Sequence, residues 1–391
     1  MSNVKLAYIS FDVVPAPKGA ATHIEAFTKS LATTYNGLEL ITVSPTAEII
    51  PRQERWPSVY HTALPAIGKT LIHRVLYFRE YLKAWLKGCY FQVIHIRSIY
   101  EGFPIALEKS KYCKNLVFEV NGLPSIELKY RYPNVEDDRE LTGKLKGQEN
   151  VCFAAADLII TPSQVTCNYL ISKGVSDAKI KVIPNGVDLT RFPFSPPSLD
   201  TLSIMGVLYF GTLSSWQGVD LAIRAIALCE FPVQLEIIGS ASKAQVRELT
   251  RLVTKLGISD RVYYFPPVSQ EELVTKIHTS DAILAPLTLC DRNLVQGCCP
   301  FKILEGMTTG TPVIASDLPV VRELGKNNQH FRLVKPNSVE EIKVALTHFR
   351  NSLELRKSLA YAAREHIDKH YTWEQANAKL SETYQLLVTN H

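Results

Sequence analysis

The chain lacks the marks of several protein classes. No apolar run reaches the roughly 20 residues that a membrane-spanning helix needs. No repeat of solenoid period and no low-complexity tract interrupts the sequence. The 43 Lys and Arg residues nearly balance 38 Asp and Glu, giving a formal net charge of +5 without the basic tracts of a nucleic-acid-binding protein. We therefore expect a globular protein that binds a small anionic ligand and no nucleic acid.

The eight cysteines form neither a disulfide framework nor a metal site. No CxxC pair occurs, and the adjacent Cys298 and Cys299 have no second pair nearby to complete a zinc site. The first residues, 1–10, enter a strand pattern without the basic start of a signal peptide. These features predict reduced thiols, no metal and a cytoplasmic location.

Short β-rich apolar runs alternate with amphipathic stretches, which is typical of parallel sheets covered by helices on both faces. The predicted strands are 5–10, 40–44, 93–96, 116–120, 158–161, 181–183, 207–210, 234–238, 262–265, 282–285 and 313–315. A Pro-rich break at 192–197 divides the series and is predicted to be an interdomain linker. We expect two doubly wound α/β domains, at 1–190 and 198–371, with a final helix at 372–391 that packs back on the first domain.

Ligands of such sheets bind beyond the carboxyl ends of the strands. In the first such turn, 17–23, small residues at Gly19 and Ala20 allow close backbone approach, and the following helix N-terminus favours an anion. A tight strand-to-helix turn needs small residues anyway, so a structural role stays open. The absence of GxGxxG and of a Walker sequence excludes a dinucleotide fingerprint and a P-loop.

Two further turns carry more chemistry. One is 210–220. The other is 292–307, in which a loop broken by Gly and Pro opens a helix that carries an acid, Glu305, one turn in. That pattern suits a diphosphate and ribose cradle.

The segments 183–188, 210–220 and 300–323 resemble the retaining glycosyltransferase family 4, which has the GT-B fold of two Rossmann-like domains facing across a cleft. The resemblance implies a nucleotide-sugar donor, with UDP-glucose as the first candidate, bound by the C-terminal domain. It also implies no cofactor and no metal, because cations and helix N-termini stabilise the departing diphosphate.

By the same resemblance, Glu305 hydrogen-bonds the donor ribose, the loop before it presents amides to the sugar and β-phosphate, and a turn after a later strand flanks the base. The donor-binding residues so implied are Gly19, Ala20, Gly211, Thr212, Gln217, Pro267, Val268, Cys298, Cys299, Pro300, Phe301 and Glu305.

The departures from the family pattern concern charge. Family members commonly carry an arginine and a lysine where this chain has Thr212 and Gln217, and a glutamate where it has Gly297. We hypothesise that Arg292 and Lys302 replace the missing cations and stabilise the leaving diphosphate. The alternative is that both are solvated surface charges.

The acceptor is expected on the first domain. Asn121 stands where the family has a histidine near the reacting centre, and His95 and Arg97 follow a neighbouring strand, either as site residues or as hydrogen-bonded scaffold. The candidate acceptor-binding residues are Lys18, His95, Arg97, Asn121, Lys129 and Arg131.

The cations among these residues favour a phosphorylated sugar. Fructose 6-phosphate is therefore the first acceptor candidate, as for family members of the sucrose-phosphate synthase type. The second is a lipid-linked or polysaccharide acceptor, with the basic and aromatic stretch 69–87 as a weak peripheral membrane contact or as an ordinary surface helix.

The mechanism implied is a same-face attack in which the leaving phosphate oxygen takes the acceptor proton, since no side chain at the expected place is a convincing nucleophile. Closure of the domains would exclude water. Two other classes stay open: a non-catalytic nucleotide-sugar sensor, and an epimerase of the same fold, which the 292–307 pattern disfavours.

Overall fold

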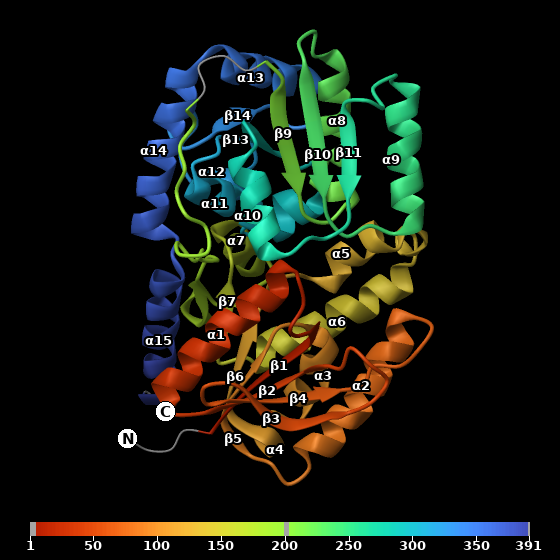
Figure 1. Cartoon of the computed structure of the whole chain (residues 1–391). Coiled ribbons are helices and arrows are strands. Elements are labelled where there is room, and N and C mark those ends of the chain that lie inside the picture. Colours follow the sequence, from red (N-terminus) through yellow and green to blue (C-terminus); the bar gives the residue numbers. More distant parts are fainter. Residues whose placement is uncertain (1–4, 199–202, 390–391) are drawn as a thin grey trace. The chain divides into compact units, whose positions relative to one another are not determined.

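A computed structural model describes residues 5–198 and 203–389. The chain divides into two compact units, which Figure 1 shows with their elements labelled. The first unit comprises residues 1–184 and 376–391, and the second comprises 185–375. Within the described ranges, no helix is both long enough and apolar enough to cross a bilayer.

The first unit is built on an eight-stranded sheet in the order β3-β4-β2-β1-β5-β6-β7-β8. Neighbouring strands are parallel, except that the edge strand β3 runs antiparallel to β4. The strands are β1 (Leu6–Val13), β2 (Leu38–Val43), β3 (Ile50–Trp56), β4 (Val59–Leu64), β5 (Phe91–Ile96), β6 (Cys113–Glu119), β7 (Leu158–Thr161) and β8 (Ile180–Val182).

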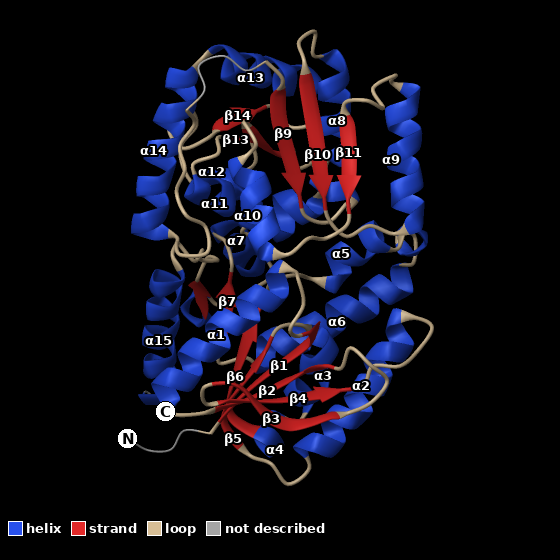
Figure 2. Ribbon diagram, viewed as in Figure 1, coloured by secondary structure: helices blue, strands red, loops and turns tan. Residues whose placement is uncertain are grey.

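Helices lie against both faces of this sheet (Figure 2). They are α1 (Gly19–Tyr35), α2 (Leu71–Leu86), α3 (Ile99–Leu107), α4 (Lys109–Tyr112), α5 (Pro124–Arg131), α6 (Arg139–Ala155) and α7 (Gln164–Ser172), with short 3-10 turns η1 (Pro133–Val135) and η2 (Asp177–Lys179). The last helix, α15 (Trp373–Thr389), joins this unit from Ala376 onward. It buries Leu380 and Tyr384, as expected for a helix that packs back on the first domain.

The second unit has a parallel six-stranded sheet in the order β11-β10-β9-β12-β13-β14. Its strands are β9 (Met205–Phe210), β10 (Val233–Ile238), β11 (Val262–Phe265), β12 (Ala282–Ala285), β13 (Val313–Ser316) and β14 (Arg332–Val334). Phe210 pairs with Ile238, and Ile238 with Phe265, so the turns that follow these strands meet at one edge. The predicted doubly wound α/β class is confirmed for both units.

The helices of the second unit again cover both sheet faces (Figure 2). They are η3 (Ser215–Gln217), α8 (Val219–Leu228), α9 (Lys243–Lys255), α10 (Gln270–His278), a π-helical turn η4 (Arg292–Gln296), α11 (Phe301–Thr309), α12 (Pro319–Arg322), α13 (Val339–Asn351) and α14 (Leu353–His370). The chain from Ser338 to the end of the description is almost entirely helical, as predicted.

The stretch predicted to be a linker belongs to the second unit, so the boundary follows Pro184 rather than residue 190. Phe192 is buried there, the Ser195 N–H donates to the Thr309 carbonyl at 2.8 Å, and the Phe194 ring packs 5.2 Å from that of Tyr361. Two aromatic side chains in this Pro-rich stretch bury apolar surface that a free linker would leave in water.

Candidate functional site

At the carboxyl edge of the second sheet, the backbones of two neighbouring turns lie in close contact. Gly211 follows β9 with φ 127°, a conformation that favours glycine, and its N–H donates to the Ile238 carbonyl at 2.9 Å. A Cβ at Gly239, directly after β10, would lie 1.7 Å from the Gly211 oxygen. The turns after β9 and β10 therefore lie so close together that no side chain fits at Gly239.

A buried asparagine joins the turn after β9 to the loop after β12. Asn293 is fully buried in η4, and its Nδ2 donates to the carbonyls of Trp216 and Thr288, both at 2.9 Å. The same two segments also approach each other at Gly218, where a Cβ would lie 2.0 Å from the Pro286 oxygen. Nothing in the sequence distinguished Asn293 from a surface loop residue, so its role was missed.

Lys302 brings a cation to this edge. Its side chain is 7% exposed, its Nζ donates to Gln217 Oε1 at 2.7 Å, and it lies 3.9 Å from the centroid of the Tyr209 ring. Burial lowers the pKa of Lys302 to about 7. A Cβ on Gly211 would be 3.4 Å from Nζ, so the ammonium group lies at the turn where Thr212 and Gln217 replace the family's cations.

Glu305 lies one turn further along α11 and is half-buried. Burial raises its pKa to about 7, against a smaller opposing effect of the Lys302 charge. An acid and a base on one helix face thus lie at the same sheet edge, and burial shifts the pKa of each toward neutral pH. Such perturbed pairs in a ligand-facing position are typical of functional sites.

The loop before α11 is fixed by its backbone. Asn185 Nδ2 donates to the Cys299 carbonyl at 2.8 Å, and Gly297 adopts φ 82°. Cys299 is buried, which raises the pKa of its thiol far above the usual range. Asn185 therefore positions the 298–301 loop of the second unit.

Arg292 supports the same loop. Its Nη1 donates to the Gly297 carbonyl at 3.0 Å, and its guanidinium lies 5.8 Å from the Trp216 ring centroid. These contacts join Arg292 both to the loop before α11 and to Trp216 in the turn that lacks the family's cations, whereas Lys302 donates directly to Gln217 in that turn.

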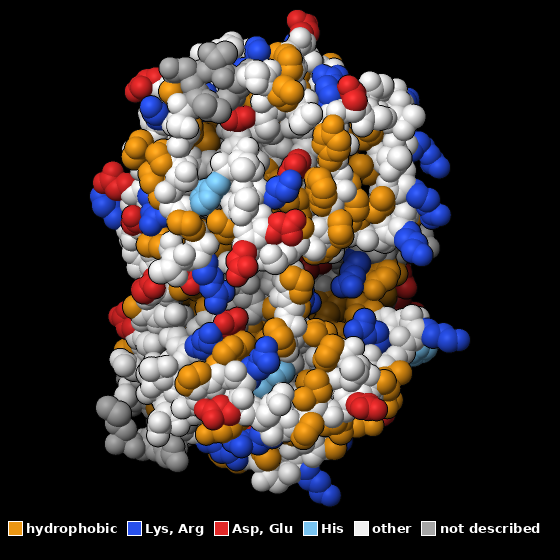
Figure 3. All heavy atoms as spheres, viewed as in Figure 1, with side chains coloured by type: hydrophobic (Ala, Val, Ile, Leu, Met, Phe, Trp, Pro, Cys, Tyr) orange, Lys and Arg blue, Asp and Glu red, His pale blue; other side chains and the backbone are white. Residues whose placement is uncertain are grey.

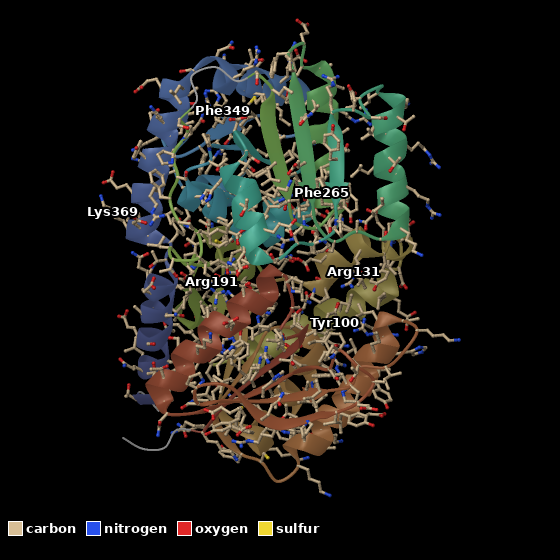
Figure 4. All side chains as sticks on the ribbon, viewed as in Figure 1. Tyr100, Arg131, Arg191, Phe265, Phe349 and Lys369 are labelled. Atoms are coloured by element: carbon tan, nitrogen blue, oxygen red, sulfur yellow. The ribbon has the colours of Figure 1, made fainter. Side chains whose placement is uncertain are left out.

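The predicted base-flanking residues lie next along this edge. Pro267 and Val268 lie in the loop after β11, where Pro267 is exposed and Val268 is half-buried. Phe265, the last residue of β11, is labelled in Figure 4. The Phe265 carbonyl accepts the Gly239 N–H at 3.1 Å. Backbone hydrogen bonds therefore connect the turn at Gly211 to the end of β10 and the turn at Gly239 to Phe265, two residues before Pro267.

A buried carboxylate organises the corresponding edge of the first unit. Glu119, at the end of β6, accepts from Tyr8 Oη at 2.7 Å and His95 Nε2 at 2.9 Å through Oε2, while Oε1 lies 2.8 Å from His23 Nε2 and also accepts from Asn121 Nδ2. Burial opposes ionisation, but the charges of His23 and Arg97 with these hydrogen bonds hold the pKa of Glu119 well below its usual range. An acid inside the apolar run 116–120 was the available signal for this cluster.

Two of the predicted acceptor cations are already paired. Arg97, 6% exposed, places Nη1 3.0 Å from Asp12 Oδ2 and Nε 3.4 Å from Glu119 Oε1. Lys18 Nζ lies 3.2 Å from Asp12 Oδ1. The acids that balance Lys18 and Arg97 were not predicted.

His95 has the scaffold role that the sequence left open. Because Glu119 is ionised, His95 carries its proton on Nε2, so Nδ1 accepts from Tyr384 Oη at 2.5 Å. Burial lowers the pKa of His95, and its ring stacks 4.2 Å from that of Tyr8. α15 is thereby bonded to the interior of the first sheet.

The remaining candidates of the first unit lie on helices. Lys129 Nζ and the Arg131 guanidinium in α5 lie 5.2 and 5.7 Å from the rings of the residues that follow them, and Figure 4 labels Arg131. Gly19 and Ala20 form the first turn of α1. The structure does not gather Lys129 and Arg131 into the Glu119 cluster by any hydrogen bond among the described contacts.

The 69–87 stretch packs mainly as a surface helix. Phe78 is fully buried, and Tyr81 and Trp85 are partly buried against the core of the first unit. Only Ile72 and Leu76 expose about half of their apolar surface on α2. Figure 3 shows cations and acids interspersed on the face that it draws. Phe78, Tyr81 and Trp85 contribute to the core of the first unit instead of forming an exposed aromatic surface.

No group of three or more His, Cys, Asp or Glu in residues 5–198 and 203–389 is arranged to hold a metal ion.

Comparison with known proteins assigns both units. The Glycosyltransferase Family 4 model matches residues 17–191, and the model for glycosyl transferases group 1 matches 206–366. The chain carries both glycosyltransferase domains. The Family 4 domain holds the Glu119 cluster, and the group 1 domain holds the edge with Lys302 and Glu305.

Curated relatives share about a quarter of the residues. A D-inositol 3-phosphate glycosyltransferase from Xylanimonas cellulosilytica is 26% identical over 263 residues, covering 63% of this chain and 61% of the relative. One from Mycolicibacterium smegmatis is 29% identical over 240 residues, covering 58% and 52%. The aligned part thus spans less than two thirds of these relatives.

Solved structures share the whole GT-B fold of the two glycosyltransferase domains. Sucrose-phosphate synthase from Thermosynechococcus elongatus has a TM-score of 0.82 at 19% identity and covers 99% of this chain and 100% of its own. Anabaena Alr3699/HepE in complex with UDP-glucose has a TM-score of 0.76 at 18% identity, with coverages of 98% and 99%. The predicted fold is confirmed.

Proposed function

We propose that the chain transfers a hexose from a nucleotide sugar, with UDP-glucose as the first candidate donor, to a hydroxyl of a sugar acceptor. The observation that carries this proposal is the buried ammonium of Lys302 bonded to Gln217 at the glycine-lined sheet edge. A diphosphate needs positive charge at this turn, and the resemblance places that charge at residues 212 and 217, where this chain has none. Lys302 supplies it from the neighbouring helix.

The donor would bind along the carboxyl edge of the group 1 domain. Glu305 would accept hydrogen bonds from the ribose, the 298–301 loop and the first turn of α11 would face the sugar and phosphate, and Pro267 with Val268 would flank the base. The solved relative bound to UDP-glucose supports this choice of donor.

We propose retention of the anomeric configuration without a covalent enzyme intermediate. The bond between the anomeric carbon and the phosphate oxygen breaks, the acceptor oxygen bonds to that carbon on the same face, and the acceptor proton passes to the leaving phosphate oxygen. Lys302 and the first N–H groups of α11 stabilise the developing charge, so no metal is needed. Arg292 keeps the loop in place through Gly297.

Fructose 6-phosphate is the first acceptor to screen, because the names of relatives include phosphorylated acceptors and a sucrose-phosphate synthase. A lipid-linked or polysaccharide acceptor is the second candidate. The membrane contact proposed for such an acceptor has less support, because Phe78 is buried in the core and Tyr81 and Trp85 pack against it.

Thermal-shift titrations with UDP, GDP, ADP and their glucose derivatives, without metal, test the donor site. We expect one nucleotide series to raise the melting temperature of the wild type, since binding to the folded state stabilises it by mass action. Glu305→Ala should lose that shift, while Glu354→Ala, an exposed acid of the same unit on α14, should keep it. Failure of all six ligands to stabilise the wild type would contradict the proposal and favour a non-nucleotide ligand.

A further inference from the structure

We propose that Asp12 sets the acceptor selectivity of the Family 4 domain. Its carboxylate prevents Lys18 and Arg97 from forming a phosphate site and itself binds a hydroxyl of the acceptor sugar. The inference rests on the proposed function for its acceptor, but the contacts that carry it lie wholly within the first unit.

Asp12 follows the buried part of β1 and bridges two cations. Oδ2 is 3.0 Å from Arg97 Nη1 and also accepts from Ser10 Oγ at 3.0 Å, while Oδ1 is 3.2 Å from Lys18 Nζ. Although burial opposes its ionisation, the charges of Arg97 and Lys18 lower the pKa of Asp12. The group is therefore a carboxylate at neutral pH, with both oxygens in use.

Arg97 is held by acids on two sides. Nη1 meets Asp12 and Nε meets Glu119, and the side chain is only 6% exposed. The main chain also positions this residue, because its N–H donates to Glu101 Oε1 at 2.8 Å. To bind a phosphate through its guanidinium fork, Arg97 would have to release Asp12, and the phosphate would then lie beside two carboxylates.

The charge balance of this edge leads to the same conclusion. Arg97 and Lys18 contribute two positive charges, and Asp12 and Glu119 two negative ones, while burial keeps His95 neutral at pH 7. His23, whose charge helps to lower the pKa of Glu119, lies 2.8 Å from that carboxylate. Asp12 offsets one of the two positive charges that it contacts, so a dianion gains less attraction from Lys18 and Arg97 than it would without Asp12.

Asp12 is the acid of this edge best placed to meet a sugar. Its side chain is 29% exposed, against 2% for the carboxylate of Glu119, while Lys18 is 47% exposed and Arg97 6%. A carboxylate held by two cations is a strong, fixed acceptor for a sugar hydroxyl. The acceptor is thus recognised through hydroxyls at this edge, and any phosphate that it carries lies outside the Lys18–Asp12–Arg97 bridge.

Calorimetric titration of inorganic phosphate tests the bridge without any donor. Asp12→Asn removes the carboxylate that Lys18 and Arg97 share, while Arg97 keeps its contact with Glu119, and we expect phosphate to bind about tenfold more tightly than to the wild type. Asp12→Asn/Lys18→Met should lose the gain, which would locate the new site at the bridge. Glu39→Gln is the matched control, because it also removes one acid paired with an arginine, Arg52, but at the amino end of β2. It should bind phosphate as the wild type does.

The single variant Lys18→Met keeps the test decisive if Asp12→Asn does not fold. The proposal expects Lys18→Met to change the phosphate affinity of the wild-type protein less than twofold, since Asp12 already neutralises this lysine. A tenfold loss in Lys18→Met, or no gain in a folded Asp12→Asn protein, overturns the proposal. Either result leaves the nucleotide titrations untouched, so failure at Asp12 is distinguishable from failure of the donor site.

Discussion

Replacing Lys302 by methionine should lower kcat/KM for the nucleotide sugar by about 10²–10³-fold, the usual effect of removing one group that stabilises developing negative charge. Methionine fills the space over Tyr209 but carries no charge, so the fold should be kept. Initial rates of UDP release over a range of donor concentrations measure the effect.

A control variant moves the positive charge from residue 302 to residue 217, its hydrogen-bond partner. Lys302→Met/Gln217→Lys places an ammonium at the partner end of the 2.7 Å hydrogen bond and should recover at least about tenfold of the lost activity. Lys343→Met, which removes a half-exposed lysine of α13, should change nothing. If Lys302→Met keeps its kcat/KM within twofold, the charge at this turn is irrelevant and the donor assignment fails.

The same residue predicts a pH dependence. With a pKa of about 7, Lys302 is largely neutral above that pH, whereas a bound diphosphate favours its charged form. UDP should therefore bind more weakly as the pH rises from 6.5 to 8.5, and the proton uptake on binding should rise toward one over that range. Lys302→Met should lose this component of the dependence, which calorimetry in buffers of different ionisation enthalpy can measure.

Replacing Glu119 by glutamine should destabilise the first unit by about 3–5 kcal/mol, because it leaves the buried Arg97 with one acid fewer. Glutamine also offers an N–H₂ group where Tyr8, His95 and His23 require an acceptor. Urea unfolding followed by fluorescence measures the loss, and Glu39→Gln, an exposed pair, should cost less than about 1 kcal/mol.

The pH dependence of that loss has a definite sign. The pKa of Glu119 is lower in the folded than in the unfolded state, so its stabilising contribution is fully present above the unfolded value of about 4.3 and is lost as the pH falls through the folded value. The difference between wild type and Glu119→Gln should shrink below about pH 4. A difference that stays constant down to pH 3 would show that the charge of Glu119 is not what stabilises the cluster.

The fold was largely predictable because buried parallel strands are continuous apolar runs. Three strands were not predicted from the sequence. β3 is an edge strand whose middle, Pro51 to Arg55, is exposed and polar; β4 follows it as the other half of a hairpin, and β14 has only three residues. The sequence of 192–197 did not show that its aromatic side chains pack against the second unit. Their packing depends on Tyr361 in α14, much later in the chain.

The candidate site was predictable where it is local. Lys302 and Glu305 stand three residues apart in a recognisable pattern, and the missing cations at 212 and 217 suggested a substitute. The Glu119 cluster was not predictable, because its hydrogen bonds join residues that are far apart in the sequence. Tyr8 and Glu119 are 111 positions apart, and His95 and Tyr384 are 289 positions apart. The pairing of Asp12 with Arg97 likewise depends on sheet order, because β1 and β5 are neighbours, whereas Lys18 is only six residues from Asp12.

Proton NMR of the protein mixed with UDP-glucose and a sugar acceptor tests whether the chain transfers glucose with retention. Fructose 6-phosphate and fructose are the first two acceptors, and a chelator is present. We expect a new glycosidic anomeric signal of the same configuration as the donor, appearing together with an equal amount of UDP. An inverted anomeric signal would contradict the same-face mechanism. Donor that binds, by its thermal shift, but stays intact with every sugar, polysaccharide and lipid-linked acceptor would contradict glycosyl transfer and make the chain a nucleotide-sugar sensor.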